Sequence, residues 1–284
     1  MSVEHYENFP VASLLCPPAL RPAVTAIYWF ARTADDLADE GDAAPEIRVR
    51  DLDAFEADLV AVARGDLPSE RWSGIFESLR PVMLRFKLPL NLLTDLLSAF
   101  RQDVVQQRYA DRAELLDYCR RSANPIGRLL LHLYGVTASD ALRQSDNICT
   151  ALQLANFWQD LGVDLPRGRL YVPASDFRQR DLAADPASFA PESVVTRALV
   201  ADLVHWARTL MLSGAPLVHA VPGRAGWELR LVVQGGLRIL EKIDALAHTP
   251  LRQRPTVGVA DMPLLLWRAL WMRRAQPLHA SETS

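Results

Sequence analysis

Apolar residues recur at helical spacing along almost the whole of this sequence, and the strict alternation typical of strands is scarce. Leu92, Leu93, Leu96, Leu97 and Phe100 show the pattern. Prolines and short polar clusters interrupt it, and this segmentation predicts roughly eight to ten helices. The spacing therefore predicts an all-α fold.

Composition supports a packed globular protein. Half of the 284 residues are hydrophobic and 23% are charged, which is ample apolar surface for an interior. No internal repeat or low-complexity tract divides the chain, so we expect one helical-bundle domain over residues 1–284. A formal net charge of −3, without a basic block, predicts no nucleic-acid partner.

Targeting signals are not evident. The first ten residues do not form a signal peptide, and no run of about 18 apolar residues is uninterrupted. Cys16, Cys119 and Cys149 are odd in number and lie in apolar surroundings, which favours free thiols of a reducing compartment over a disulfide framework. We expect a cytoplasmic protein that does not span a membrane.

A first acidic motif occupies residues 31–40. Asp35 and Asp39 are four residues apart, so on a helix both carboxylates project from one face, and Asp36 lies beside them. Such acids are also common on solvated helix faces. Here the preceding residues 26–31 are apolar, which favours a buried helix whose carboxylates need cations or hydrogen-bond donors.

A second acidic motif is more specific. Asn156, Asp160 and Asp164 follow one another at steps of four residues, with Gln153 one turn earlier. Steps of four drift by only about 40° around a helix, so these oxygen-bearing side chains are expected on one stripe. Apolar residues such as Phe157 flank the stripe. We expect the two motifs to form one site.

Hard oxygen ligands without histidine or cysteine favour Mg²⁺, or Mn²⁺, over zinc or copper. The candidate metal ligands are Asp35, Asp39, Asn156, Asp160 and Asp164. A carboxylate about 4 Å from a diphosphate charge is repelled by roughly 4 kcal/mol at an effective dielectric of about 20. Metal ions would bridge the two, and they would stabilise diphosphate as it leaves a carbocation in a dry cavity.

Basic and aromatic residues could assist this chemistry. Arg32 lies one turn before Asp35, and Arg167 and Arg169 follow the second motif; each could hold the leaving group or be an ordinary surface charge. Aromatic side chains could stabilise a cation at the cavity wall or simply fill the core: Phe9, Tyr28, Tyr109, Tyr118, Phe157 and Trp158. No dinucleotide-binding fingerprint is present, so we expect no NADPH.

Several segments, in order, resemble the head-to-head prenyl synthases of the squalene/phytoene synthase family. They are residues 26–39, Asp103 with Arg108-Tyr109, Tyr118-Cys119, and residues 152–173. The resemblance implies a helical isoprenoid-synthase bundle with a central apolar cavity and a prenyl diphosphate substrate. It also implies that the metal–diphosphate assembly is held by Asp35, Asp36, Asp39, Asn156, Asp160 and Asp164, with Gln153 nearby. We take Tyr28 and Asn124 as further candidate catalytic residues, and the candidate substrate contacts are Phe9, Arg32, Asp36, Tyr118, Ser122, Gln153, Gln159, Arg169 and Tyr171.

Residues 5–15, 122–127 and 235–242 resemble the hydroxysqualene synthases of the bacterial hopanoid pathway. That branch takes presqualene diphosphate, removes diphosphate, rearranges the cyclopropylcarbinyl cation and captures it with water. Gln159 stands where an arginine usually precedes the aspartate, and Gly236 where phytoene synthases often carry a tyrosine. Ser122, Asn124 and Gln159 are the first candidates to hold the captured water, and each could otherwise cap a helix or pack locally.

Two alternatives remain. The first is condensation of two prenyl diphosphates to presqualene diphosphate, dehydrosqualene or phytoene. The second is a non-catalytic assembly or binding relative, in which the acidic motifs should have eroded, whereas both are intact here.

The last helical segment, residues 263–274, combines leucines and Trp267 and Trp271 with Arg268, Arg273 and Arg274. It predicts either a terminal core helix or an interfacial helix on an anionic membrane. In the second case the protein would be peripheral at the inner face of the membrane. The resemblance implies other squalene and hopanoid pathway enzymes as functional partners.

Overall fold

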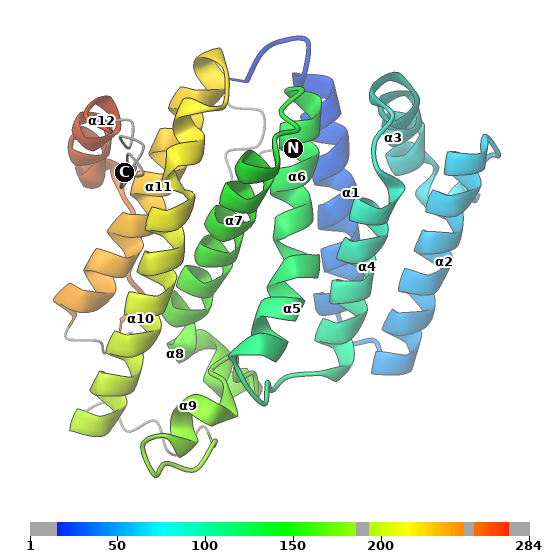
Figure 1. Ribbon diagram of the computed structural model, residues 1–284. Helices are drawn as coiled ribbons and strands as arrows, with labels where there is room; N and C mark the ends of the chain where they lie inside the picture. Colours follow the sequence, from blue (N-terminus) through cyan, green and yellow to red (C-terminus); the bar gives the residue numbers. More distant parts are fainter. Residues whose placement is uncertain (1–15, 186–192, 247–252, 273–284) are drawn as a thin grey trace, which may run out of the picture.

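The computed structural model describes residues 16–185, 193–246 and 253–272 (Figure 1). Over these residues the chain is helical and contains no strand; the one β-bridge joins Arg108 to Leu170. The predicted all-α class is confirmed. Phe9, Arg273 and Arg274 lie outside the described residues, as does the segment 5–15.

The described part of the chain forms twelve α-helices, more than the predicted eight to ten. The helices are α1 (Arg21–Asp39), α2 (Pro45–Arg64), α3 (Ser73–Phe86), α4 (Leu90–Val105), α5 (Arg112–Ser122), α6 (Asn124–Leu133), α7 (Ser139–Gln159), α8 (Leu161–Asp164), α9 (Ala174–Arg178), α10 (Val194–Gly214), α11 (Gly223–Ala245) and α12 (Met262–Leu270). Short 3₁₀ turns are Glu70–Trp72, Leu165–Arg167, Ala215–His219 and Val259–Asp261.

Local sequence signals set several helix ends. Pro45 begins α2 and Gly65 ends it in the left-handed conformation, with φ of 99°. The carboxylate of Asp111 caps α5 by accepting from the Glu114 amide at 2.9 Å, while Glu114 accepts from the Ala110 amide at 2.5 Å. These caps satisfy amides that have no partner within the helix.

The helices pack around apolar clusters in two halves. One half holds α1 to α4, with Phe30, Phe55 and Phe76 at its centre. In the other half α7 is central, because it packs against α5, α6, α10 and α11. Contacts of α4 with α5 and α6 join the halves. That residues 1–284 form a single domain stays a prediction.

An apolar cavity of about 110 Å³ lies between α1, α6, α7 and α11. Its walls include Val24, Leu131, Cys149 and Val232. The resemblance implied a central apolar cavity, whereas this one lies toward the end of the bundle where α1, α7 and α11 begin and α6 ends (Figure 1).

We predict that Gly214→Ala destabilises the fold. A Cβ at Gly214 would lie 2.6 Å from the Gln144 carbonyl oxygen and 3.0 Å from the Ile148 amide nitrogen, both backbone atoms of α7. Forcing α10 away from α7 should lower the free energy of unfolding by about 1–3 kcal/mol. Urea titration followed by circular dichroism measures it.

The matched control is Gly235→Ala in α11, where a Cβ would have no atom within 4 Å. This change should be neutral or stabilise by about 0.5–1 kcal/mol, because alanine restricts the unfolded chain. Equal unfolding midpoints for the two variants would contradict the close approach of α10 to α7.

Candidate active site

The end of α1 carries the first acidic cluster, as predicted. Arg32 neutralises it from within the same helix: Nη1 lies 3.3 Å from Asp35 Oδ2, and Nη2 lies 2.6 Å from Asp36 Oδ1 and 2.7 Å from Glu40 Oε1. Phe30 on the same helix is fully buried. The cluster is therefore held against the core by its apolar neighbours and compensated by one guanidinium.

The second cluster lies where α7 ends. Asn156 Nδ2 donates to Asp160 Oδ2 at 2.8 Å. The expected continuous helix is interrupted at Asp160, whose φ and ψ are −98° and 9°, and Gly162, a weak helix former, follows. The amides of Asp160 and Asp164 nevertheless still bond to the carbonyls four residues earlier, both at 2.9 Å. The three side chains therefore remain at successive turns.

Arg169 connects the two clusters. Its Nη2 pairs with Asp39 on α1, and its positive charge also acts on Asp164. The backbone fixes it, because the Arg169 amide donates to the Asp164 carbonyl at 3.0 Å and the Leu170 amide donates to Gln107 at 2.9 Å. The predicted proximity of the two acidic motifs is thus present in the structure.

Burial and mutual repulsion raise the pKa of carboxylates in both clusters. Burial raises the pKa of Asp35 to about 6, with further contributions from the charges of Asp39 and Asp36, and Arg32 opposes the rise. The pKa of Asp164 also rises to about 6, through burial and then the charge of Asp160. Asp35 still exposes 37% of its side chain, so a ligand can reach it. Such groups gain from a cation.

Asp103 on α4 completes the acidic group. Tyr118 donates to its Oδ2 at 2.8 Å, and its Oδ1 is buried with no hydrogen-bond partner in the part of the chain described. Burial raises its pKa to about 7, and the charges of Asp35 and Asp39 add to the rise. In the sequence, Asp103 stood out only as part of the family resemblance. Its position among the apolar residues of α4 could have identified it as a buried acid.

Arg254 is a second residue beside the acidic clusters that the sequence did not reveal. Its guanidinium pairs with Asp160, with Nη2 3.2 Å from Oδ2. Next to it, the Pro255 carbonyl accepts from Gln159 Nε2 at 2.6 Å. The segment before α12 therefore crosses the end of α7. No spacing rule relates residues 94 positions apart, so only the tertiary fold reveals this pair.

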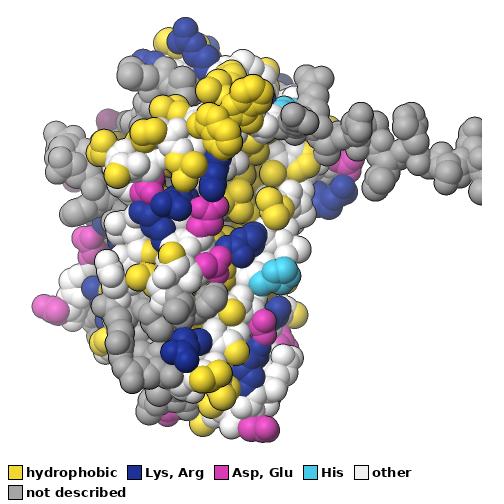
Figure 2. Space-filling model, turned by 90° about the vertical axis from the view of Figure 1, so that its left-hand side faces the viewer, with side chains coloured by type: hydrophobic (Ala, Val, Ile, Leu, Met, Phe, Trp, Pro, Cys, Tyr) yellow, Lys and Arg dark blue, Asp and Glu magenta, His cyan; other side chains and the backbone are white. Residues whose placement is uncertain are grey.

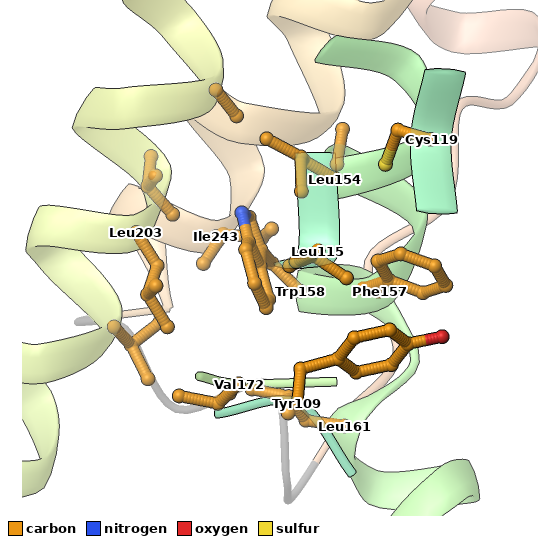
Figure 3. Close-up of a cluster of buried hydrophobic side chains, with 14 of the residues drawn as sticks. Tyr109, Leu115, Cys119, Leu154, Phe157, Trp158, Leu161, Val172, Leu203 and Ile243 are labelled. Carbon is orange, nitrogen blue, oxygen red and sulfur yellow. The ribbon is translucent and has the colours of Figure 1, made fainter. Parts of the chain in front are cut away.

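Aromatic rings adjoin the carboxylates. Phe157 and Tyr171 stack at 3.8 Å with an angle of 8° between their planes, and Tyr118 lies 6.4 Å from Tyr171. Tyr109 stacks on Tyr171 at 5.9 Å. Trp158 is different, because it points into the core between Leu203 and Ile243, away from Phe157 (Figure 3). Of these α7 rings, Phe157 is the one that belongs with the site.

The remaining candidates are buried or half-buried. Asn124 is 7% exposed, and its Oδ1 accepts from Thr150 Oγ1 at 3.0 Å. Ser122 Oγ is buried, and within the described segments it has no hydrogen-bond partner. Tyr28 and Gln153 are half-buried on α1 and α7. The hydrogen bonds of Asn124 and Gln159 go to Thr150 and Pro255, away from the carboxylates, so the roles expected of these two residues stay predictions.

The donor set fits Mg²⁺. No three acidic, histidine or cysteine side chains in the described ranges are grouped closely enough to hold an ion by themselves. Mg²⁺ is commonly bound by one or two carboxylates together with substrate phosphate oxygens. Carboxylates of raised pKa on two facing elements supply ligands of that kind, and the side-chain amide of Asn156 lies beside Asp160.

Fold and site together define an all-helical isoprenoid synthase, with two acidic clusters facing one another at one end of a helical bundle. A profile of the squalene/phytoene synthase family matches residues 3–261. The chain belongs to the squalene/phytoene synthase family and is therefore a member of a family of enzymes.

Individual relatives agree. The chain is 35% identical over 263 residues to a hydroxysqualene synthase of Sinorhizobium fredii, covering 92% of this chain and 86% of that protein. It is 29% identical over 261 residues to a presqualene diphosphate synthase of Rhodopseudomonas palustris, covering 91% of each. The crystal structure of squalene synthase HpnC from Alicyclobacillus acidocaldarius superposes with a TM-score of 0.79 at 36% identity, covering 87% of this chain and 91% of that chain.

We predict that Asp103→Asn flattens the pH dependence of stability in metal-free buffer. The pKa of Asp103 is raised to about 7 in the folded protein, so the folded state binds this proton more tightly than the unfolded state. That stabilisation is present at low pH and is lost as the pH rises through about 7. The melting temperature should fall from about pH 6 to about pH 8 in the original protein, and fall less in Asp103→Asn.

The control is Asp66→Asn, which removes an exposed carboxylate far from the site. Its melting curve should follow that of the original protein across the pH range. A pH dependence of Asp103→Asn as steep as that of the control would show that Asp103 does not titrate in this window.

Proposed function

We propose that this chain is a Mg²⁺-dependent hydroxysqualene synthase, which converts presqualene diphosphate to hydroxysqualene in squalene and hopanoid formation. The observation that carries the proposal is the pair of acidic clusters that Arg169 connects at one end of an apolar bundle. The identity with hydroxysqualene synthases, 35% and 32% over most of this chain, selects this reaction within the family.

The chain's own cations hold the diphosphate. Asp35, Asp39, Asn156, Asp160 and Asp164 would bind Mg²⁺ or Mn²⁺, which when bound supplies positive charge that stabilises the leaving diphosphate. In the structure Arg32, Arg169 and Arg254 each pair with these acids. When other cations occupy the carboxylates, the guanidinium groups can donate to diphosphate oxygens instead, which suits their paired N–H donors.

The hydrocarbon part extends toward the apolar cavity. At 1.5 Å per residue, Val24 at the cavity lies about 16 Å along α1 from Asp35. The same spacing separates Cys149 from Asp160 along α7. One amphiphilic substrate can therefore place its charged end at the acids and its apolar chain between the same two helices.

Water captures the rearranged cation. The bond from carbon to diphosphate oxygen breaks and its electron pair leaves with the diphosphate; a water oxygen then forms the new C–O bond and loses one proton. Ser122 and Asn124 lie at the junction of α5 and α6, with buried polar atoms that could hold this water. Gln159 is a further candidate for this water, and its Nε2 donates to the Pro255 carbonyl at 2.6 Å.

Gly236 supports the hydroxylating branch. A Cβ at this position would lie 2.5 Å from Met211 Cε and 2.9 Å from Leu152 Cδ2. The tyrosine that phytoene synthases often carry here would require α7, α10 and α11 to repack. The sequence difference is therefore built into the packing of this chain.

The location of the reaction follows from its chemistry. Substrate and product carry long hydrocarbon chains that partition into lipid. We infer a cytoplasmic enzyme at the inner face of the membrane, working with other enzymes of squalene and hopanoid formation.

We predict that activity requires a divalent cation and each facing carboxylate. Chelator should abolish turnover and Mg²⁺ should restore it, while Asp35→Asn, Asp39→Asn, Asp160→Asn and Asp164→Asn should each lower kcat about 100-fold or more. Mg²⁺ with a diphosphate analogue should also raise the melting temperature, because it binds only the folded protein.

The control is Asp140→Asn at the opposite end of α7, where the side chain is 73% exposed. It should keep its activity. Full turnover in the presence of chelator would contradict the metal assignment. An equal loss of kcat in Asp140→Asn would indicate that the substitutions act through folding.

We predict that the product is an alcohol whose oxygen comes from solvent. Presqualene diphosphate and Mg²⁺ in ¹⁸O-labelled water, without NADPH, should yield hydroxysqualene carrying the label, as read by mass spectrometry. A hydrocarbon product, or a strict need for NADPH, would refute water capture. Product formed from farnesyl diphosphate alone would instead show that this chain also performs the condensation.

A further inference from the structure

The outward face of α12 is entirely apolar. Met262, Leu266, Trp267 and Leu270 are 41–61% exposed, and Trp271, directly after the helix, is 63% exposed. The only charged residue of α12 is Arg268, and it pairs with Glu241 on α11 at 2.6 Å. A surface helix normally turns polar side chains outward. This face therefore differs from a solvated one, and residues 263–272 are not simply a core helix.

Trp227 on α11 extends the apolar surface. It is 43% exposed, and the Arg230 guanidinium lies 4.6 Å from the centre of its ring. Arg230 also donates to the Ala269 carbonyl at 3.0 Å, so the start of α11 adjoins the end of α12. We define the α12 patch as Trp227, Met262, Leu266, Trp267, Leu270 and Trp271. Figure 2 shows hydrophobic side chains gathered above a band of charged ones on this side of the molecule.

The α12 patch and the apolar cavity lie on different faces of the first turns of α11. Leu229 and Val232 on α11 line that cavity, close in sequence to Trp227. The patch also lies toward the end of the bundle opposite α8 and α9, which lie near the acidic clusters (Figure 1). The patch is therefore at the same end of the bundle as the cavity, and the carboxylates are at the other end.

We propose that the α12 patch docks on a phospholipid bilayer that contains anionic headgroups. Tryptophan is enriched at the membrane–water interface, and leucines add apolar area that binding can bury. Arg224, exposed beside Trp227, and Arg273-Arg274, which follow the patch in the sequence, complement anionic lipid.

The length and hydrophobicity of the helices indicate how the protein would contact a bilayer. In the described residues no helix combines the length and hydrophobicity needed to cross a bilayer, so α12 would lie in the plane of the interface. The preference for a bilayer over a second copy of the chain rests in part on the proposed function, because that reaction needs a hydrocarbon substrate delivered and an alcohol of similar length removed.

The test is sedimentation with vesicles of mixed phosphatidylcholine and phosphatidylglycerol, in the absence of substrate. The double variant Trp267→Glu/Trp271→Glu should weaken vesicle binding by about tenfold or more, a factor that corresponds to about 1.4 kcal/mol. The matched control is Leu67→Glu/Leu84→Glu, which alters residues that are 80% and 65% exposed on the other half of the bundle. The control should bind like the original protein, and far-UV circular dichroism checks that both variants fold.

Several outcomes would overturn the docking proposal. One is failure of the original protein to bind vesicles; another is equal binding by both double variants. A dimer in vesicle-free buffer that the tryptophan changes convert to monomer, without vesicle binding, would assign the patch to a second copy. Activity on presqualene diphosphate in detergent is measured separately: vesicle binding without turnover refutes the proposed function alone, and turnover without vesicle binding refutes docking alone.

Discussion

The site depends on bringing like charges together. Six acids from three parts of the chain converge at one end of the bundle: Asp35, Asp36, Asp39, Asp103, Asp160 and Asp164. Burial and mutual repulsion raise the pKa of three of them to about 6 or 7. A fold can retain such a group only if cations compensate it and if packing elsewhere supplies the free energy. The apolar clusters around α7 and α1 fill that second role.

Compensation comes from three arginines of different origin. Arg32 is on α1 itself, Arg169 is in the turn after α8, and Arg254 is in the segment before α12. Each makes an ion pair that another cation could replace. If another cation replaced an arginine at a carboxylate, the charge of the acidic clusters would stay compensated. The released guanidinium group could then move toward an anionic ligand. The same residues can therefore stabilise the protein and take part in binding, which a permanent core of buried ion pairs could not do.

The periodic part of this arrangement was predictable from the sequence. Steps of four residues place Asp35 with Asp39, and Asn156 with Asp160 and Asp164, because helical geometry is local. The interruption at Asp160 was not predicted, although its amide keeps the helical bond and the stripe persists. Arg254 and the Tyr118–Asp103 bond were missed for a different reason: they depend on how distant helices cross.

The same distinction applies to the aromatic residues. From the sequence, Phe157 and Trp158 were equal candidates for the cavity wall. Adjacent residues of α7 point to different sides of the helix, so Phe157 stacks on Tyr171 while Trp158 enters the core. The α12 segment left two interpretations open from its sequence, because core and interfacial helices share leucine and tryptophan. The structure adds the burial pattern: Leu265 and Ala269 are buried and the opposite face is exposed, and membrane contact stays a proposal.

Two helices set the distance between the charged and apolar ends of the site. Both α1 and α7 line the cavity through one stretch and carry acids about 16 Å further along. Because each helix is rigid, the separation is fixed by chain geometry, and the position of α10 against α7 is fixed by the close contact of Gly214 with the α7 backbone. A change in helix packing far from the carboxylates would therefore shift a bound hydrocarbon relative to its diphosphate. Packing residues in this fold act on the chemistry through position, even where they touch no charged group.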